Sequence, residues 1–506
     1  MSSMALAQLR PRVLPRGRIA AMRSASRFYT EATGPLAGLR VLDLSRILAG
    51  PSATQMLADM GAEVLKVEQP KSGDDTRRYA PPFLQKGHSR DGADDSEVAA
   101  YFASCNRNKY SVAVDFKKKE GQDVVKKLLR DADVLIENFK PGGLAKYGLA
   151  FDDLKDMYPH LIYCSISGFG HSGPYSKRPA YDMLIQAMGG SMSLTGEPEG
   201  APMKTGLSLF DLCSGLHGVI GILAALHNKH NTGLGQHVDV AMLDVSVSLL
   251  CNQGMNFLAK KQRQKRVGNN HPNVVPYQVM PASDGYFILT ASNNDQFERF
   301  LKVAGRLDLM QDERFNTMEN RVINREHVTP ALNDITSGQT KQFWLENLEK
   351  ETVGCAPILH LDEVFTDPQV QSRDMEIRMN LPGFNKPCSL IGSPMKFSRT
   401  KVDYRMPPPR VGEHTEQVLL NAGYSEDEIT ELHEIGAVDN AKFEVPSPEI
   451  ALAPKKERTP AYKISGRSWK KMRSVSVPTV MTDDDPLLYN EGPSSVDGPA
   501  PLEDMK

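Results

Sequence analysis

One acidic side chain stands out for its position. The stretch Arg178–Gly190 reads RPAYDMLIQAMGG, so that Asp182 follows a proline turn and begins an otherwise apolar helical segment. A carboxylate at a helix start is favoured by the helix dipole, which makes a helix cap the plain interpretation of Asp182. A carboxylate with a pKa of about 4 is also ionised at neutral pH, so such a group could act as a nucleophile without a general base. Taken alone, however, Asp182 is better interpreted as a helix cap than as a catalyst.

The histidines and cysteines of the sequence give little support for metal or redox chemistry. Three histidines, His227, His230 and His237, lie around an Asn-Thr-Gly turn, but the run contains no cysteine or carboxylate. The six cysteines are scattered without a CxxC pair, which favours free thiols. We therefore predict no metal site and no cofactor, since that spacing is not typical of metal ligands.

The elements around Asp182 follow an alternating pattern. Residues 39–44 and 62–67 are apolar, strand-like runs, separated by a helix that begins near Pro51 and ends at Gly61. The alternation continues with strands at 111–115, 133–136 and 161–166 and helices at 120–131 and 151–156. This order predicts right-handed βαβ units and a Rossmann-like parallel sheet in an α/β protein. No GxGxxG is present, so the dinucleotide fingerprint is absent.

The second half of the chain changes its pattern. An apolar helix at 207–228, a strand at 237–242 and a long helix at 243–260 precede a hairpin at Asp284–Gly285. Helices at 295–306, 320–336 and 340–350 complete a smaller α+β domain. We therefore predict a large domain that is discontinuous in sequence, formed by residues 35–230 and by residues 366–438, which also include a return linker. Between its two parts we predict linker helices at 231–274 and a small α+β domain at 275–365.

Composition narrows the class of partner. The chain has 506 residues, 40% of them hydrophobic, and a net charge of −2. It is therefore globular and has no basic bias, so we expect no nucleic acid partner. No apolar run reaches the roughly 18 residues of a membrane span. The segment Leu216–Leu226 is predicted to be a buried core helix, and no membrane partner is expected.

The two ends differ from the middle. Residues 1–29 contain six arginines and no Asp, Glu or Lys, which is typical of a mitochondrial transit peptide. The alternative is a basic tail without a targeting role. Nine prolines fall between 446 and 501, so residues 440–506 are predicted to be a disordered tail. The expected location of the mature protein is the mitochondrial matrix.

A series of motifs carries a family resemblance. In order, these are RVLDLSRILAGPSATQMLADMGAEVLKVE (40–68), SGDDTR (72–77), NRNKYSVAVD (106–115), ENFKPG (137–142), SGFGHSGP (167–174), PAYDMLIQA (179–187), TGLSLFDLCSGLHGVIGILAAL (205–226) and GEHT (412–415). From about residue 35 to 435 the chain resembles the family III CoA-transferases of the CaiB/BaiF type. The resemblance implies a Rossmann-like large domain, an interlocked homodimer, and Asp182 as the nucleophile.

The resemblance also implies substrates and an order of events. GDDTR, NRNK and VVPYQ are most similar to members that move CoA from succinyl-CoA to a dicarboxylic acid such as glutarate in mitochondria. The nucleophilic aspartate would form a mixed anhydride and then an aspartyl-CoA thioester. Coenzyme A would take part as a substrate moiety, and the partners would be an acyl-CoA and a free dicarboxylic acid.

Binding residues follow from motif position. Coenzyme A carries phosphates that call for Lys and Arg. The candidates for CoA binding are Arg46, Ala49, Lys109, Asn138, Phe139, Lys140 and Lys146. Arg77 is a candidate partner of a substrate carboxylate. Oxyanion donors are expected from the backbone of Gly189-Gly190 or Gly268-Asn269-Asn270.

Two other functions remain open at this point. A 2-methylacyl-CoA racemase resembles the same fold and uses the equivalent aspartate as an acid and base. In that enzyme the preceding residue is typically His, whereas this chain has Tyr181. The other alternative is a non-catalytic CoA-binding protein, against which the intact set of motifs argues.

Overall fold

The computed structural model describes residues 33–84, 98–381, 384 and 386–439. All of them belong to the first of two compact units, residues 1–450, and the second unit, 451–506, lies outside the described residues. The predicted transit peptide at 1–29 and the predicted disordered tail at 440–506 also lie outside the described residues.

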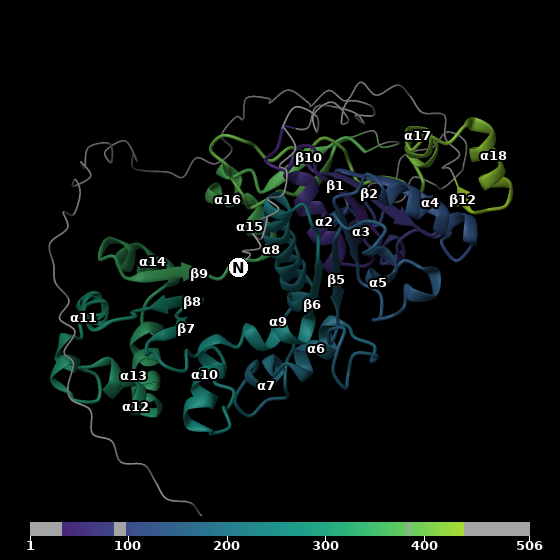
Figure 1. Cartoon of the computed structure of the whole chain (residues 1–506). Helices are drawn as coiled ribbons and strands as arrows, with labels where there is room; N and C mark the ends of the chain where they lie inside the picture. The colour runs from purple at the N-terminus through teal and green to yellow at the C-terminus, as the bar shows by residue number, and fades with distance from the viewer. Residues whose placement is uncertain (1–32, 85–97, 382–383, 385, 440–506) are drawn as a thin grey trace, which may run out of the picture. The chain divides into compact units, whose positions relative to one another are not determined.

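The largest sheet in the described part of the chain has seven strands in the order β12-β3-β2-β1-β4-β5-β6 (Figure 1). Neighbouring strands are parallel except β12, which pairs antiparallel with β3. The strands are β1 (Arg40–Asp43), β2 (Glu63–Glu68), β3 (Lys109–Val114), β4 (Val134–Glu137), β5 (Ile162–Ser167), β6 (His237–Ala241) and β12 (Val438–Asp439). The 3-2-1-4-5-6 order is that of a Rossmann-like sheet, so the predicted fold class is confirmed.

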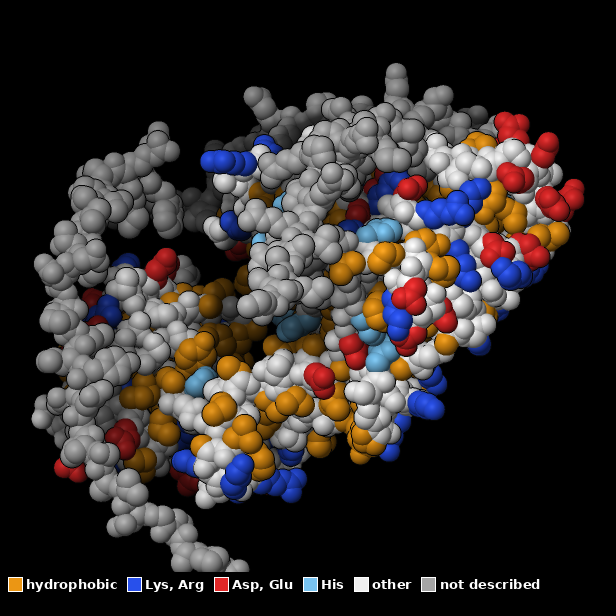
Figure 2. Space-filling view, viewed as in Figure 1, with side chains coloured by type: hydrophobic (Ala, Val, Ile, Leu, Met, Phe, Trp, Pro, Cys, Tyr) orange, Lys and Arg blue, Asp and Glu red, His pale blue; other side chains and the backbone are white. Residues whose placement is uncertain are grey.

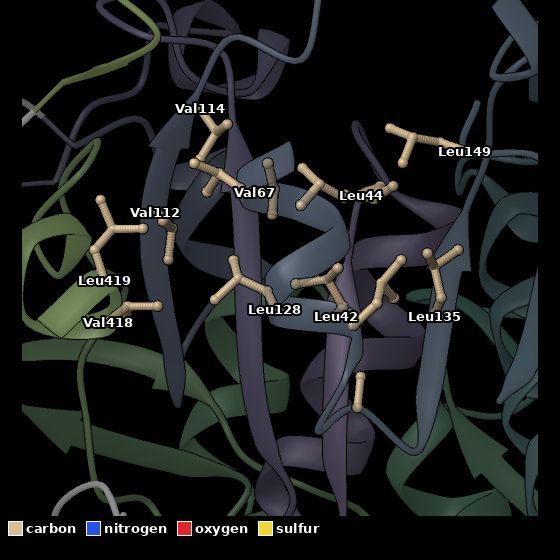
Figure 3. Packing of buried hydrophobic residues seen from close by; sticks show 14 of the residues in the cluster. Leu42, Leu44, Val67, Val112, Val114, Leu128, Leu135, Leu149, Val418 and Leu419 are labelled. Atoms are coloured by element: carbon tan, nitrogen blue, oxygen red, sulfur yellow. The ribbon is translucent and has the colours of Figure 1, made fainter. Parts of the chain in front are cut away.

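Helices cover both faces of this sheet, because parallel strands are apolar on both sides. One face packs under α4 (Lys119–Leu129) and α17 (Thr415–Asn421), where Leu42, Val112 and Leu128 meet Val418 and Leu419 (Figure 3). The other face packs under α2 (Ala49–Asp59) and α8 (Leu209–Thr232). The remaining elements of this part are η1 (Asp75–Arg78), α3 (Ala100–Ser104), η2 (Ala145–Tyr147), α5 (Phe151–Leu154), α6 (Asp182–Met188), α7 (Ser191–Leu194) and α18 (Glu426–Glu434).

Helix α8 approaches α2 closely at Gly215. A Cβ at Gly215 would lie 2.6 Å from both the Ala49 carbonyl oxygen and Ser52 Oγ. We therefore expect Gly215→Ala to force the two helices apart and to lower the free energy of unfolding by about 1–3 kcal/mol in urea denaturation. Gly338→Ala is the matched control, because the nearest atom to its added Cβ is 3.4 Å away. Equal stability of the two variants would contradict this packing.

The outer face of α8 is exposed, whereas the sequence predicted a buried core helix. The helix spans 24 residues and is, by length and composition, apolar enough to cross a membrane. Its inner face packs on the sheet, but Leu216 and Ile220 are 47% and 61% exposed. The prediction of a buried core helix therefore holds for one face only. Exposed apolar side chains also gather over α10 (Cys251–Lys260), where Met255, Phe257 and Leu258 lie (Figure 2).

The predicted single helix at 243–260 is wrong. The structure has α9 (Met242–Ser248) and then α10, separated by a break at which Cys251 has a φ of 44°. A positive φ cannot continue a right-handed helix. Apolar periodicity alone did not reveal the break.

A smaller α+β region follows, as expected. Three antiparallel strands, β7 (Tyr277–Ala282), β8 (Gly285–Thr290) and β9 (Gly354–Pro357), form its sheet. Its own apolar core includes Phe287, Phe300 and Trp344. Its helices are α11 (Asn294–Val303), η3 (Leu307–Gln311), α12 (Met318–Ile323), α13 (Arg325–Ser337) and α14 (Lys341–Lys350). The chain continues through α15 (Leu361–Thr366), α16 (Pro368–Ser372) and the hairpin β10 (Glu376–Met379)–β11 (Cys388–Ile391).

Candidate active site

The loops after β1 and β4 meet where the strand order of the large sheet reverses. Ligands of open α/β sheets bind in the crevice at this point, outside the carboxyl ends of the strands. Here Asn138 joins the two loops: its Oδ1 accepts from the Arg46 N–H at 2.8 Å, and its Nδ2 donates to the Arg46 carbonyl at 2.7 Å. The side chain of Asn138 is thus committed to positioning the loop that carries Arg46.

Several predicted CoA-binding residues gather around this junction. The Arg46 guanidinium lies 5.3 Å from the centre of the Phe139 ring. Phe139 and Tyr147 both contact Phe116 edge-on, and Lys146 Nζ lies over Tyr147. Lys140 follows Phe139 directly and is exposed. The structure therefore brings together cationic and aromatic groups suited to phosphates and an adenine ring.

The loop after β1 is held in a strained conformation. Ile47 has a φ of 70°, which is rare for a β-branched residue. Its N–H donates to both carboxylate oxygens of Asp74 at 3.2 Å. Lys66 Nζ in turn donates to Asp74 at 2.9 Å and to the Ser45 carbonyl at 3.0 Å. This buried pair keeps the loop between Ser45 and Ala49 in place.

Lys109 does not reach the junction, and the prediction that it binds CoA is wrong in this structure. Its side chain is 0% exposed. Its Nζ donates to Asn106 Oδ1 at 2.8 Å, to the Pro51 carbonyl at 2.9 Å and to Asp43 at 3.2 Å. Burial lowers the pKa of Lys109 to about 8 against the opposing charge of Asp43. All of these partners hold Lys109 inside the fold.

Arg77 is engaged in a similar way. Its guanidinium forms an ion pair with Glu68 at 2.6 Å, donates to the Pro409 carbonyl and stacks over Phe102. The predicted role as partner of a substrate carboxylate therefore conflicts with its contacts. Glu68, at the end of β2, is buried and also accepts from Ser111 of β3, so the Glu68–Ser111 hydrogen bond links these two strands.

Asp182 is the first residue of α6, but its side chain caps the N-terminus of α8. Its Oδ1 accepts from the backbone N–H of Phe210 at 2.7 Å and of Asp211 at 3.2 Å, in the first turn of α8. Its Oδ2 accepts from Gln186 Nε2. The side chain is only 9% exposed. Both oxygens are thus occupied, which argues against Asp182 as the nucleophile and supports the cap interpretation.

Asp211 is a second carboxylate beside Asp182, and the sequence analysis did not single it out. It lies one residue beyond Phe210 in the first turn of α8, and its side chain is half-buried. Burial first, and the adjacent charge of Asp182 second, raise its pKa to about 7. In the described part of the chain we find no hydrogen-bond donor to its carboxylate. The available signal was a charged residue at the start of the most apolar helix, within the motif TGLSLFDLCSG.

Asp182 and Asp211 lie near residues that adjoin the junction of the β1 and β4 loops. The charge of Asp211 acts on Tyr101 of α3, whose ring packs edge-on against Tyr79 with centroids 5.5 Å apart. Tyr79 is within electrostatic reach of both Tyr181 and Arg46. One turn after Asp211, Gly215 meets Ala49 at the start of α2. Ala49 therefore lies close to the first turns of α8, which Asp182 caps.

Two of the five expected oxyanion donors are occupied. The Gly189 N–H donates to the Ile185 carbonyl at 2.7 Å as the end of α6. The Asn270 N–H donates to the Val267 carbonyl at 3.1 Å, as does its side chain. Neither backbone group is free for an oxyanion in this conformation, so these two assignments are not supported by the geometry.

Glu137 holds the loop after β4, which carries Asn138 and Phe139. It ends β4, is buried, and its Oε2 accepts from the Phe139 N–H at 2.7 Å. Ser165, which also bonds His237 Nε2 at 2.9 Å, is its second hydrogen-bond partner. Burial raises the pKa of Glu137 to about 7 despite these bonds.

This shift predicts a pH dependence of stability. The folded protein holds the Glu137 proton more tightly than the unfolded chain does, because the pKa is raised in the fold. The free energy of unfolding therefore falls as the pH rises from about 4.5 through 7. Glu137→Gln keeps an acceptor for Phe139 and never ionises. We expect its gain in unfolding free energy over wild type to be about 3 kcal/mol larger at about pH 8 than at about pH 4. Urea titrations at both pH values test this, and a pH-independent difference would contradict it.

Comparisons with known proteins show the family of this chain. The model of the family described as CoA-transferase family III matches residues 36–415. The succinate–glutarate CoA-transferase of Agrobacterium fabrum is 44% identical over 76% of this chain and 95% of its own length. The human succinyl-CoA:glutarate CoA-transferase is 37% identical over 80% of this chain and 90% of its own. The crystal structure of a CaiB/BaiF family protein from Brucella suis superposes with a TM-score of 0.68 at 44% identity, covering 77% of this chain and 100% of the other. The chain therefore belongs to the family III CoA-transferases.

Proposed function

We propose that this enzyme transfers CoA from succinyl-CoA to a dicarboxylic acid such as glutarate, with Asp211 as the nucleophile. The substrates follow the names of the two relatives. The observation that carries the nucleophile is the contrast between two neighbouring carboxylates. Asp182 has both oxygens hydrogen-bonded, whereas Asp211 accepts none within the described residues. A carboxylate without hydrogen bonds and with a raised pKa is the better nucleophile once ionised.

The reaction then runs as four acyl substitutions. A carboxylate oxygen of Asp211 attacks the succinyl thioester carbon, the C–S bond breaks, and CoA thiolate leaves a succinyl–aspartyl anhydride. The thiolate attacks the aspartyl carbon, and succinate departs with the bridging oxygen. The acceptor carboxylate attacks the resulting aspartyl-CoA thioester and expels the thiolate, which finally attacks the acceptor carbonyl and releases the Asp211 carboxylate. No net proton transfer is required.

Retention of CoA between these steps is essential, because a nearby thiolate outcompetes water for the anhydride. Arg46, Lys140 and Lys146 supply positive charge around the junction, and Phe139 supplies an aromatic face. These groups suit the phosphates and adenine of CoA, with the pantetheine arm passing Ala49 toward Asp211.

We also propose a homodimer in the mitochondrial matrix. The stripe Leu212, Leu216, Ile220 and Leu223 runs along one exposed face of α8. Contiguous exposed apolar surface is typical of a protein interface, and a second copy is the partner that the family resemblance implies. The arginine-rich residues 1–29 support the matrix assignment.

Acyl mixing tests the function. Succinyl-CoA and labelled glutarate are incubated with the enzyme, and labelled glutaryl-CoA is measured by mass spectrometry. Its formation supports transfer. Exchange of deuterium at the α-carbon of a 2-methylacyl-CoA without transfer would instead assign a racemase. Binding of acyl-CoA with neither reaction would contradict both and leave a CoA-binding protein.

A further inference from the structure

The segment between α7 and α8, residues 195–208, is anchored near both of its ends. Near its start, the Arg266 guanidinium donates to the Glu197 carbonyl at 3.0 Å. Near its end, the Thr205 N–H donates to Gln186 Oε1 of α6 at 2.9 Å. Gln186 is only 1% exposed, so this second bond is shielded from water. The backbone of the segment is therefore fixed relative to α6.

Lys204 brings a positive charge to this segment. Its Nζ donates to the Thr205 carbonyl at 3.1 Å, and the side chain is exposed. In the part of the chain that the structure describes, no carboxylate forms an ion pair with this ammonium. The charge of Lys204 is therefore left uncompensated by the described residues, and the neutral carbonyl is its one described acceptor.

This charge lies close to the two carboxylates of the site. The Gln186 amide, which holds Thr205, also donates from its Nε2 to Asp182 Oδ2. Asp182 in turn accepts from the Asp211 N–H at 3.2 Å. Three contacts, through Thr205 and Gln186, thus separate the Lys204 ammonium from the Asp182 carboxylate. The ammonium lies beside the carboxylates and is bonded to neither of them.

A dicarboxylate needs a cation at such a distance. Both carboxylates of a diacid such as glutarate have a pKa of about 4, so the diacid arrives with two negative charges. One end must reach the acylated aspartate, which leaves the other end near Asp182 and Asp211, where like charges repel. Four carbon–carbon bonds of about 1.5 Å join the two ends of glutarate, so the far carboxylate lies about 5 Å from the reacting one. A cation beside the reacting atoms, and not among them, complements this charge.

We propose that Lys204 is a specificity-determining residue: its ammonium binds the far carboxylate of the diacid and so selects dicarboxylic over monocarboxylic acceptors. This inference rests on the proposed function. To bind the diacid, Lys204 exchanges the neutral Thr205 carbonyl for a charged acceptor, which forms a stronger bond. Arg178, the cation nearest to Asp182 in sequence, is instead stacked over the Tyr175 ring at 3.8 Å.

A comparison of two acceptors tests this role. Glutarate and pentanoate have the same number of carbons, but pentanoate has only one carboxylate. With succinyl-CoA as donor, we expect wild type to prefer glutarate by at least about 100-fold in kcat/KM. Lys204→Met keeps the bulk of the side chain without its charge. We expect it to lose about 10–100-fold in kcat/KM for glutarate, chiefly through KM, with the value for pentanoate unchanged.

Two further variants serve as controls. Lys204→Arg keeps the charge and should retain most of the preference for glutarate. Lys265→Met removes an exposed lysine next to Arg266 and should leave both values as in wild type. Because Lys204 is exposed, all three variants should unfold in urea at the same concentration as wild type, which separates a loss of specificity from a loss of folding.

Each outcome decides the proposal. Loss of the glutarate preference in Lys204→Met, but not in Lys204→Arg or Lys265→Met, supports it. An unchanged ratio of glutarate to pentanoate in Lys204→Met overturns the role of Lys204 and leaves the proposed function intact. A wild-type enzyme that uses both acids equally well, or transfers CoA to neither, overturns the proposed function together with this inference.

Discussion

Replacement of Asp211 by Asn is expected to abolish CoA transfer. The amide has no nucleophilic oxygen, so neither the anhydride nor the aspartyl thioester can form, and we expect kcat for glutaryl-CoA formation to fall by at least about 10³-fold. The junction around Arg46 and Phe139 is untouched by the change. Binding of succinyl-CoA, measured by calorimetry, should therefore remain within a few-fold of wild type.

The fold should tolerate this substitution well. The Asp211 side chain accepts no hydrogen bond from the described residues, and burial raises its pKa to about 7. An uncharged amide avoids the cost of ionising there, so the variant should be at least as stable as wild type near pH 8. Asp182→Asn is the matched control and should retain measurable transfer. Full activity of Asp211→Asn with an inactive Asp182→Asn would return the nucleophilic role to Asp182.

Replacement of Lys66 by Met is expected to have the largest effect on stability. Lys66 and Asp74 are both completely buried as side chains, and their ion pair spans 2.9 Å. Although burial opposes it, the charges of Asp74, Asp43 and Glu68 hold the pKa of Lys66 above its ordinary range. Loss of the ammonium leaves these carboxylates uncompensated, so we expect a loss of about 3–5 kcal/mol in the free energy of unfolding.

The same variant should also weaken CoA binding. Lys66 bonds the Ser45 carbonyl and orients Asp74 toward the strained Ile47, and Arg46 and Ala49 flank that residue. Released from these bonds, Ile47 should relax to a negative φ and displace its neighbours. We expect KM for succinyl-CoA to rise about tenfold in whatever fraction remains folded. Lys260→Met, at an exposed position, serves as control, and unfolding free energies within about 1 kcal/mol of each other would contradict the role of Lys66.

The large sheet was predictable because its signal is local. Each strand such as Arg40–Asp43 or Val134–Glu137 is a short apolar run, and each intervening helix has its own period. The motifs then indicated the family and, through it, Arg46, Asn138 and Phe139, which the structure brings together. The break at Cys251 escaped prediction because a positive φ in the middle of an apolar helical pattern leaves no mark on periodicity.

The order of apolar runs determined the fold class, and the motifs determined the family and with it the acyl-transfer chemistry and a carboxylate nucleophile, since these depend on residue type and order. Which lysine could reach a phosphate was decided by burial, because Lys109 points into the core whereas Lys140 is exposed. Which carboxylate could react was decided by contacts across α6 and α8. Asp182 and Asp211 are 29 positions apart, and only the packing of these helices assigns the hydrogen bonds to one and leaves the other able to attack.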